Sequence, residues 1–245
     1  MPKSKNTLGL AMIMQNEESH IPAAIAQFFH VVDDIVVVDG GSTDGSVEWA
    51  EKMGARVFHR PFDNDFSAQK NYAIEQLETD WVYLHDPDER LEPTLIEILP
   101  YITCPVNQRD LMAAGFLPRM TDPEGMFDCI GIARKNYIDG VQTDIYPDYQ
   151  YRVFANYCRF EGAVHEKIIN FKDRTELDYT RPSSAMPAVK EKMDSQTIDT
   201  ERGQLELDVK LNHPDEISRF NILHYKSGPK QEHQDELYRR IREGN

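Results

Sequence analysis

Four short apolar runs lie at intervals in the first 90 residues, and this arrangement constrains the fold more than any other feature of the sequence. They cover residues 8–14, 35–38, 55–59 and 81–84, and β-branched and aromatic side chains are frequent in them. Runs of this length and composition are typical of buried strands. The stretches between them carry apolar residues at helical spacing. A strand–helix alternation of this kind predicts an α/β fold with a mostly parallel, right-handed sheet covered by helices.

Polar loops follow three of these four strands. They cover residues 15–18, 39–46 and 86–89. In a parallel sheet of this type the ligand binds beyond the carboxyl ends of the strands, at the point where the strand order reverses. We therefore expect the three loops to meet at one crevice.

The third loop holds two aspartates separated by one proline. Pro87 lacks an N–H and has a fixed φ, so the strand is expected to end there with Asp86 and Asp88 in a defined turn. Two close carboxylates repel each other, and a hard cation that prefers oxygen ligands, Mn²⁺ or Mg²⁺, relieves the repulsion. An acidic turn in water is the alternative interpretation of the pair alone.

Charge and composition exclude several classes of partner. The 27 basic and 42 acidic residues give a formal net charge of −15, which argues against nucleic acid and against an anionic membrane surface. No apolar run approaches the roughly 18 residues of a membrane span, and the N-terminus lacks the apolar core of a signal peptide, so we expect a cytoplasmic protein with no transmembrane segment. The three cysteines are too few and too scattered for a disulfide framework or a zinc site.

Beyond residue 90 the pattern changes. Pro93 suits the first turn of a helix through Leu99, and strands are expected over residues 111–118, 127–138 and 149–155. These elements suggest a mixed sheet beside the parallel one.

Several short motifs, in this order along the chain, resemble those of family 2 glycosyltransferases of the GT-A fold. They are the polar residues 15–18 after the first strand, the turn over residues 39–45, the group of Phe66 with Gln69, Lys70 and Asn71, the pair Asp86 and Asp88, the run from Arg152 to Phe154, and the run from Val164 to Glu166. Within the family, the chain is most similar to the bacterial lipopolysaccharide-core glucosyltransferase-like group. The resemblance covers residues 8 to about 171 and again 220–226.

The resemblance implies an inverting, metal-dependent enzyme that moves a sugar from a nucleotide-diphosphate sugar, a UDP-sugar in particular, to a hydroxyl of a glycan or another acceptor. It places the donor among Gln15, Asn16, Glu17, Asp39, Lys70 and Asp86. It implies a Mn²⁺ or Mg²⁺ ion held by Asp88, Asp86 and His224. Glu166 is the implied general base, with His165 as the second candidate and Asp144 or Asp148 behind them.

The resemblance also implies the domain organisation. We expect one GT-A domain over residues 1–226, with a nucleotide-binding half to residue 90 and an acceptor-side half after it. The polar stretch 172–215 is expected to be a lid or a partly disordered insert. The tail from 227 to 245 is expected to be a charged helix, either a solvated face or a contact in a homo-oligomer.

Two positions depart from the family pattern. Gly40 stands where many members have a second aspartate that contacts uracil. The resemblance therefore does not identify the nucleotide base of the donor. His85 stands where leucine is frequent, and it is either a third metal ligand or a packed residue at the strand end.

The sequence leaves three other functions to compare with the enzyme. A catalytically inactive nucleotide-sugar or glycan-binding module of the same fold is the main alternative. A phosphatase with an aspartate nucleophile would need the acidic pair near the first strand and a threonine where Arg90 stands. A nucleotidyltransferase would need a glycine-rich loop in place of residues 15–18.

Overall fold

The computed structural model describes most of the chain. The described residues are 6–103, 119–120, 129–146, 148–164, 166–170, 176–177, 197–198, 204–207 and 221–243.

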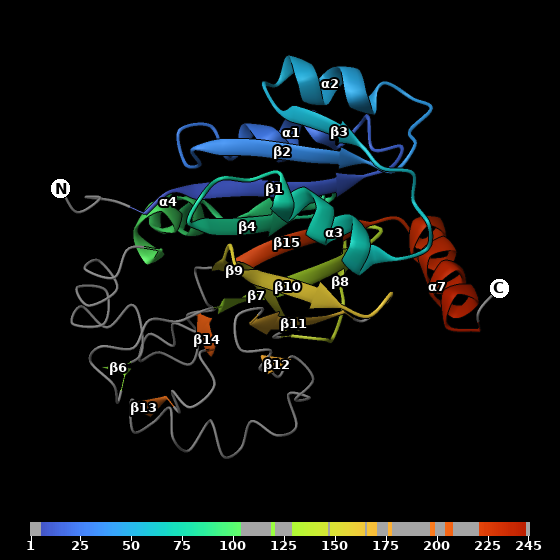
Figure 1. The fold of residues 1–245 in the computed structure, drawn as a ribbon. Coiled ribbons are helices and arrows are strands. Elements are labelled where there is room, and N and C mark those ends of the chain that lie inside the picture. The colour runs from blue at the N-terminus through green and yellow to red at the C-terminus, as the bar shows by residue number, and fades with distance from the viewer. Residues whose placement is uncertain are drawn as a thin grey trace.

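Four parallel strands form one half of the main sheet (Figure 1). Their order in space is β3 (Arg56–His59), β2 (Asp34–Asp39), β1 (Leu8–Met14) and β4 (Trp81–His85), all parallel. The helices α1 (Ile21–Ala26), α2 (Ser46–Lys52) and α3 (Phe66–Glu75) connect them in turn. The strand order reverses between β1 and β4. The three polar loops all leave the sheet at the carboxyl ends of β1, β2 and β4.

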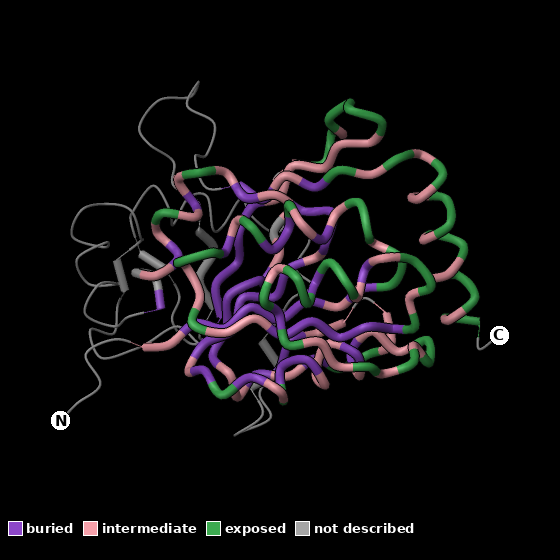
Figure 2. Tube along the Cα trace, turned by 90° about the horizontal axis from the view of Figure 1, so that it is seen from above, coloured by how far each residue is buried: buried purple, intermediate pink, exposed green. Residues whose placement is uncertain are grey.

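Both faces of β1, β2 and β4 are largely buried, which explains why these runs are continuously apolar, whereas the edge strand β3 is partly exposed. In β2, Val37 packs in a cluster with α1, α2 and α4 (Pro93–Ile102), whereas Val36 and Val38 pack on the other face with α3. Successive side chains of a strand point to opposite faces, so helices on both sides are needed to cover them. Each fully buried side chain of this kind contributes about 1.5–3 kcal/mol. Figure 2 shows the buried residues concentrated along these central strands.

A mixed half continues the same sheet. Next to β4 come β9 (Asp148–Ala155), β7 (Cys129–Ile138), β15 (Asn221–Lys226) and β5 (Glu89–Leu91). Here β9 is antiparallel to β4 and β7, β15 is parallel to β7, and β5 is antiparallel to β15. The pairing of β5 with β15 joins the acidic turn to a strand about 130 residues later in the chain, as Leu91 opposite Ile222 shows.

Smaller elements complete the description. Two short strands, β8 (Val141–Gln142) and β14 (Gln204–Leu207), pair with β7, and β10 (Cys158–Glu161), β11 (Lys167–Asn170) and β12 (Glu176–Leu177) form a three-stranded sheet. A two-stranded pair joins β6 (Arg119–Met120) to β13 (Thr197–Ile198). The last helix, α7 (Gly228–Glu243), stands beyond the carboxyl ends of the parallel strands (Figure 1).

The elements expected in the first 90 residues are confirmed, with shifts at their ends. The first helix is shorter than expected, because beyond Ala26 the N–H groups of Phe28 and Phe29 bond to carbonyls three residues back. His30 then adopts a left-handed φ of 67° before the chain enters β2. The strand β5 was not expected. The expected strand over residues 111–118 lies outside the described residues, as does most of the polar stretch 172–215, so the lid remains a prediction.

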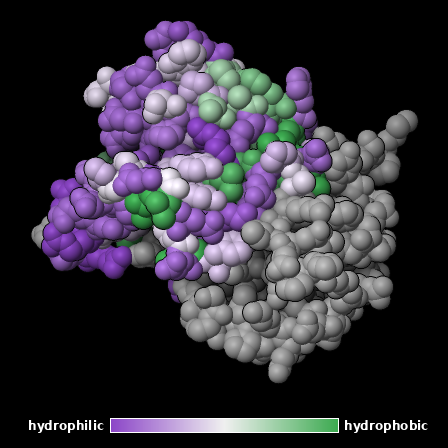
Figure 3. Space-filling model, turned by 180° about the vertical axis from the view of Figure 1, so that it is seen from behind, coloured by the Kyte–Doolittle hydropathy of each residue, from purple (hydrophilic) through white to green (hydrophobic). Residues whose placement is uncertain are grey.

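The described surface is mostly hydrophilic. Figure 3 shows hydrophilic residues over most of the described part of one face, with hydrophobic residues in smaller groups. Among the helices that the structure describes, none combines the length and the apolar character that crossing a membrane requires.

Candidate active site

Asp39, the last residue of β2, shapes the turn that follows it. Its buried carboxylate accepts the backbone N–H groups of Gly41 at 3.1 Å and Ser42 at 3.0 Å, and His59 Nδ1 lies 3.3 Å away. Burial alone would raise the pKa of Asp39, but these hydrogen bonds, those from Ser42 foremost, hold the pKa below its ordinary value. Gly41 has a φ of +111°, which other residues rarely adopt. The turn is therefore built around an ionised carboxylate.

Asn16 fastens the loop after β1 to this turn. Its backbone N–H donates to Ser42 Oγ at 2.9 Å, and its side-chain Oδ1 accepts the backbone N–H of Thr43 at 2.8 Å. Gln15 Nε2 lies 3.5 Å from the carbonyl oxygen of Gly40. The two loops thus form one polar rim.

The packing around Gly40 accounts for the missing second aspartate. A Cβ at this position would lie 3.3 Å from the Cβ of Phe62 and 3.4 Å from the carbonyl oxygen of Met14. Both distances are tight, so a larger side chain would require its neighbours to move.

Asp88 lies beside His224 at the start of the mixed half. The backbone carbonyl of Asp88 accepts the N–H of Tyr225 at 3.1 Å, which holds the acidic turn against β15. The side chains then face each other, with His224 Nε2 3.5 Å from Asp88 Oδ1. Burial would raise the pKa of Asp88, but His224 and Lys230 hold that pKa well below its usual range. Asp88 is therefore a buried, ionised carboxylate.

A chain of hydrogen bonds fixes the ring of His224. Asp148 can only accept, so it binds the amide nitrogen of Asn136 at 2.8 Å and leaves the amide oxygen for His224 Nδ1 at 2.7 Å. Nδ1 consequently carries a proton. Nε2 therefore faces Asp88 Oδ1 and is the ring atom available to a cation shared with Asp88.

Asp86 has a different partner. Arg152 of β9 donates at 2.5 Å both to Asp86 Oδ2 and to Oε1 of Glu89, which is fully buried. Arg134 of β7 also reaches Glu89 Oε1, at 3.4 Å. Burial would raise the pKa of Asp86, whereas the charges of Arg152 and then Lys70 hold it far below its usual range.

Lys70 and Glu166 form an ion pair next to this group. Lys70 Nζ donates to Glu166 Oε1 at 2.7 Å, and both side chains are largely buried. Burial would lower the pKa of Lys70, but Glu166 and Asp86 raise it above its ordinary value, so the lysine is charged.

The residues around Lys70 explain its motif. Asp65 caps α3 by accepting the N–H of Ala68 at 2.9 Å. Asn71 exchanges two hydrogen bonds of 2.8 Å with the backbone of Phe160, which ties α3 to β10. The motif thus fixes Lys70 opposite the segment that carries Glu166.

The tail takes part in this site. On α7, Lys230 Nζ lies 2.8 Å from Glu17 Oε1 and 3.1 Å from Asp88 Oδ2. Further along the helix, the ring of Tyr238 packs edge-on against Phe66 at 5.5 Å. The expectation that the tail is only a solvated face or an oligomer contact is therefore wrong for the inward side of α7.

The structure brings most of the expected residues to one edge of the sheet. Lys230 joins Glu17 to Asp88, and Asp88 faces His224. Lys70 pairs with Glu166, and the charge of Asp86 helps to raise the pKa of Lys70. Gln15, Asn16 and Asp39 form the adjoining rim. His165 lies outside the described residues.

His85 is packed into the core. Its ring meets Phe28 edge-on at 4.9 Å and is fully buried, and burial lowers its pKa to about 3. The interpretation of His85 as a packed residue at the strand end is the one that this environment supports.

Four residues that take part in the site were not predicted as site residues: Glu89, Arg134, Arg152 and Lys230. Glu89 directly follows the acidic pair, and Arg152 belongs to a motif already noted, so these two carried a local signal. Arg134 and Lys230 carried none, because their partners lie far away in the sequence.

The residues around Asp88 fit a divalent cation in part. Asp88 and His224 offer an oxygen and a nitrogen ligand, and Asn136 orients the histidine in the way metal-binding histidines are usually oriented. Asp86 gives one oxygen to Arg152. Within the described ranges no group of three or more His, Cys, Asp or Glu side chains is arranged to hold a metal. A cation at this site would thus rely on Asp88 and His224 from the protein.

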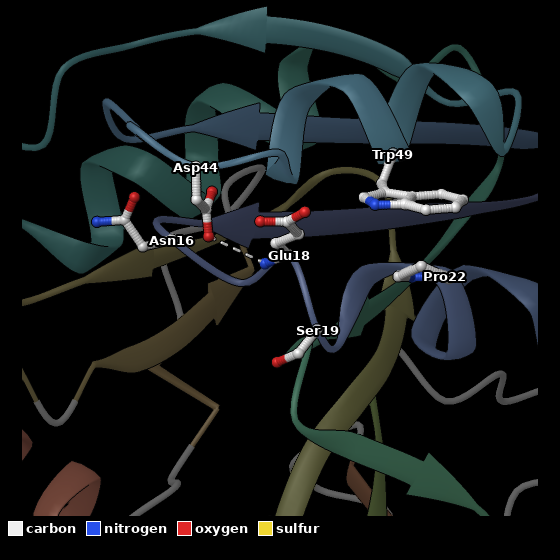
Figure 4. A pocket seen from close by; sticks show the side chains of 6 residues that line it. All are labelled: Asn16, Glu18, Ser19, Pro22, Asp44 and Trp49. Carbon is white, nitrogen blue, oxygen red and sulfur yellow. Dashed lines mark hydrogen bonds between the residues drawn. The ribbon is translucent and has the colours of Figure 1, made fainter.

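A shallow, open cavity of about 580 Å³ lies on the outer side of the rim (Figure 4). Asn16, Glu18, Ser19, Pro22, Asp44 and Trp49 line it. The carboxylates there are engaged in the loops, since Asp44 accepts the N–H of Glu18 at 3.2 Å and Glu18 accepts that of Gly45 at 3.1 Å. The cavity borders the rim without containing Asp86 or Asp88.

Comparison with protein families gives a match for part of the chain. Residues 10–101 match the model of glycosyl transferase family 2. The sheet order confirms the predicted α/β fold, in which helices cover a sheet with a parallel half.

Two proteins with similar sequences are named as glycosyltransferases. An uncharacterised glycosyltransferase of Rickettsia conorii is 35% identical over 102 residues, covering 42% of this chain and 36% of that protein. The lipopolysaccharide core biosynthesis glycosyltransferase LpsC of Rhizobium meliloti is 33% identical over 101 residues, covering 39% and 37%. The matched part thus spans about a third of the length of these relatives.

Among solved structures, glucosyl-3-phosphoglycerate synthase of Mycobacterium tuberculosis, in complex with Mn²⁺, uridine diphosphate and phosphoglyceric acid, is similar over part of the fold. It is 21% identical with a TM-score of 0.38, covering 55% of this chain and 44% of that one.

Proposed function

We propose that the protein is an inverting, metal-dependent glycosyltransferase, because residues 10–101 match the model of glycosyl transferase family 2. Its donor would be a nucleotide-diphosphate sugar, a UDP-sugar in particular, and its acceptor a hydroxyl of a glycan or a similar carbohydrate. The observation that carries the proposal is the pair of Asp88 and His224, a buried carboxylate with an imidazole nitrogen 3.5 Å away, at the edge where the three polar loops meet.

The rim would hold the nucleotide. Asp39 is ionised and buried at a strand end, so its free lone pairs suit a ribose or base donor. Gln15 and Asn16 line the same rim, and Lys70 offers a charge for the phosphates.

The leaving diphosphate needs its charge neutralised as the sugar bond breaks. A divalent ion at Asp88 and His224 would supply this neutralisation, worth several kcal/mol of transition-state stabilisation. Asn136 and Asp148 would hold the histidine ring in place, and Arg152 would keep Asp86 ionised.

Glu166 is the proposed general base. One of its oxygens pairs with Lys70, and the other can accept the proton of the acceptor hydroxyl. General-base catalysis of this kind contributes roughly 10²- to 10⁴-fold.

An inactive binding module of the same fold is the second candidate. The observation that favours it is Lys230, which occupies the side of Asp88 where a cation would bind.

Two measurements decide between these functions. A thermal-shift screen of nucleotide sugars with Mn²⁺ identifies the donor, because a ligand that binds only the native state raises its stability. Donor hydrolysis and transfer are then followed by release of the nucleoside diphosphate. Release in step with donor binding supports the enzyme, and binding without release supports the inactive module. If no nucleotide sugar shifts the melting temperature, both proposals are wrong.

A further inference from the structure

Lys230 makes contacts that its position in a charged tail does not lead one to expect. Its ammonium lies 2.8 and 3.0 Å from the two oxygens of Glu17 and 3.1 Å from Asp88 Oδ2. An ammonium has three N–H donors, and here three carboxylate oxygens surround it. Lys230 thus acts as the counter-ion of both acids.

The fold places this ammonium in the site. The N–H of Gly228, at the start of α7, donates to Asp139 Oδ1 at 3.1 Å. One turn beyond Lys230, Gln234 binds Lys226, and a second turn on, Tyr238 packs against Phe66. The first two turns of α7 are therefore anchored on both sides of Lys230.

The same carboxylate is assigned to the metal by the proposed function. A divalent ion shared by Asp88 Oδ1 and His224 would lie close to the ammonium of Lys230, which contacts the other oxygen of the same carboxylate. Like charges repel strongly in a partly buried site, so arrival of the ion weakens the hold of Asp88 on the ammonium.

A diphosphate would offer the displaced ammonium a new partner. The donor brings additional negative charge next to Glu17, Asp86 and Asp88, in a chain whose formal net charge is already −15. The side chain of Lys230 is 35% exposed, so its head can move while α7 stays in place.

We propose that Lys230 is a donor-binding residue that changes partners, holding Glu17 and Asp88 in the free protein and the diphosphate of the donor in the complex. The inference rests on the proposed function, and it adds a phosphate-binding residue from the tail to the donor site.

The test compares Lys230→Met with Arg240→Met by calorimetry. Arg240 is exposed on the same helix, so its substitution removes the same charge without touching the site. Mn²⁺ is titrated alone, and UDP and GDP are titrated in saturating Mn²⁺. Losing a charge-assisted hydrogen bond to the diphosphate should weaken its binding in Lys230→Met by about 10- to 100-fold. Mn²⁺ alone should bind at least as tightly as in the wild type, since its competitor is gone.

Two further variants keep the result interpretable. Lys230→Arg retains the charge and should restore diphosphate binding in large part, and Lys230→Gln serves if the methionine variant does not fold. Wild-type diphosphate affinity in the Met or Gln variant, or an equal loss in Arg240→Met, overturns the inference. If the wild type binds neither UDP nor GDP with Mn²⁺, the proposed function itself fails and the inference falls with it.

Discussion

At the scale of single residues, the site consists of charges that already have partners. Glu166 is paired with Lys70, Asp86 with Arg152, and Asp88 with Lys230. For Asp86 and Asp88 the neighbouring cations hold the pKa well below its usual range, although burial alone would raise it. Substitution of single residues can therefore distinguish a residue that takes part in the reaction from one that only neutralises a neighbouring charge.

Glu166→Gln tests the base. The amide keeps the size of the side chain and can still accept from Lys70, but it cannot take up a proton at neutral pH, so transfer should fall by roughly 10²- to 10⁴-fold. Metal and donor binding should survive. Steady-state kinetics on this variant and on Glu161→Gln, an exposed neighbour on β10, make the measurement.

Near-normal transfer in Glu166→Gln would exclude Glu166 as the general base and leave His165 or Asp144 as the next candidates. Asp148 is a poorer candidate than the sequence suggested, because Arg134, Asn136 and Gln150 already bind its oxygens. Weaker donor binding in the variant would instead make Glu166 part of the donor pocket.

Asp39→Asn tests the turn after β2. The pKa of Asp39 is lowered in the folded protein, so its contribution to stability is present above the unfolded pKa of about 3.9 and is lost as the pH falls through the folded value. At pH 7 the variant should lose about 1.5–3 kcal/mol, typical of hydrogen bonds to a charged group. The difference from the wild type should shrink below about pH 4.

Urea unfolding at several pH values measures this difference, with the exposed Asp235→Asn as the control. A loss of stability in Asp39→Asn that stays the same from pH 7 to pH 3 would contradict the role of the ionised carboxylate.

At the scale of elements, the acidic turn depends on strands from three parts of the chain. The turn follows β4, continues into β5, and is held by Arg152 of β9 and by the pairing of β5 with β15. The buried network of Asp86, Glu89 and Arg152 therefore joins the parallel half of the sheet to the mixed half.

Arg152→Met should destabilise the protein by about 3–5 kcal/mol, because it leaves a fully buried Glu89 without its closest counter-charge. Arg56→Met removes the exposed ion pair with Asp34 and should cost less than about 1 kcal/mol. Chemical denaturation compares the two. Equal losses would mean that the network around Arg152 does not hold the two halves together.

At the scale of the whole molecule, the sequence predicted what local patterns determine. The β-branched run 35–38 and the apolar run 8–14 are local features, and both became central strands. β5 was missed because its three residues include Glu89 and Arg90, and only pairing with β15 makes them a strand. Lys230 was missed for the same reason, since more than 200 residues separate it from Glu17. Long-range pairing completes a site whose local parts the motifs already suggested.

The most direct test of the account is calorimetric titration of UDP into the wild-type protein, with saturating Mn²⁺ and with excess chelator. The acids of the site and the diphosphate repel each other, so each ligand should strengthen the binding of the other. Asp88→Asn should lose this coupling, because it removes a ligand of the ion. The account predicts tight binding of UDP only with Mn²⁺ and only with Asp88 in place, and equally tight binding of UDP in chelator would contradict it.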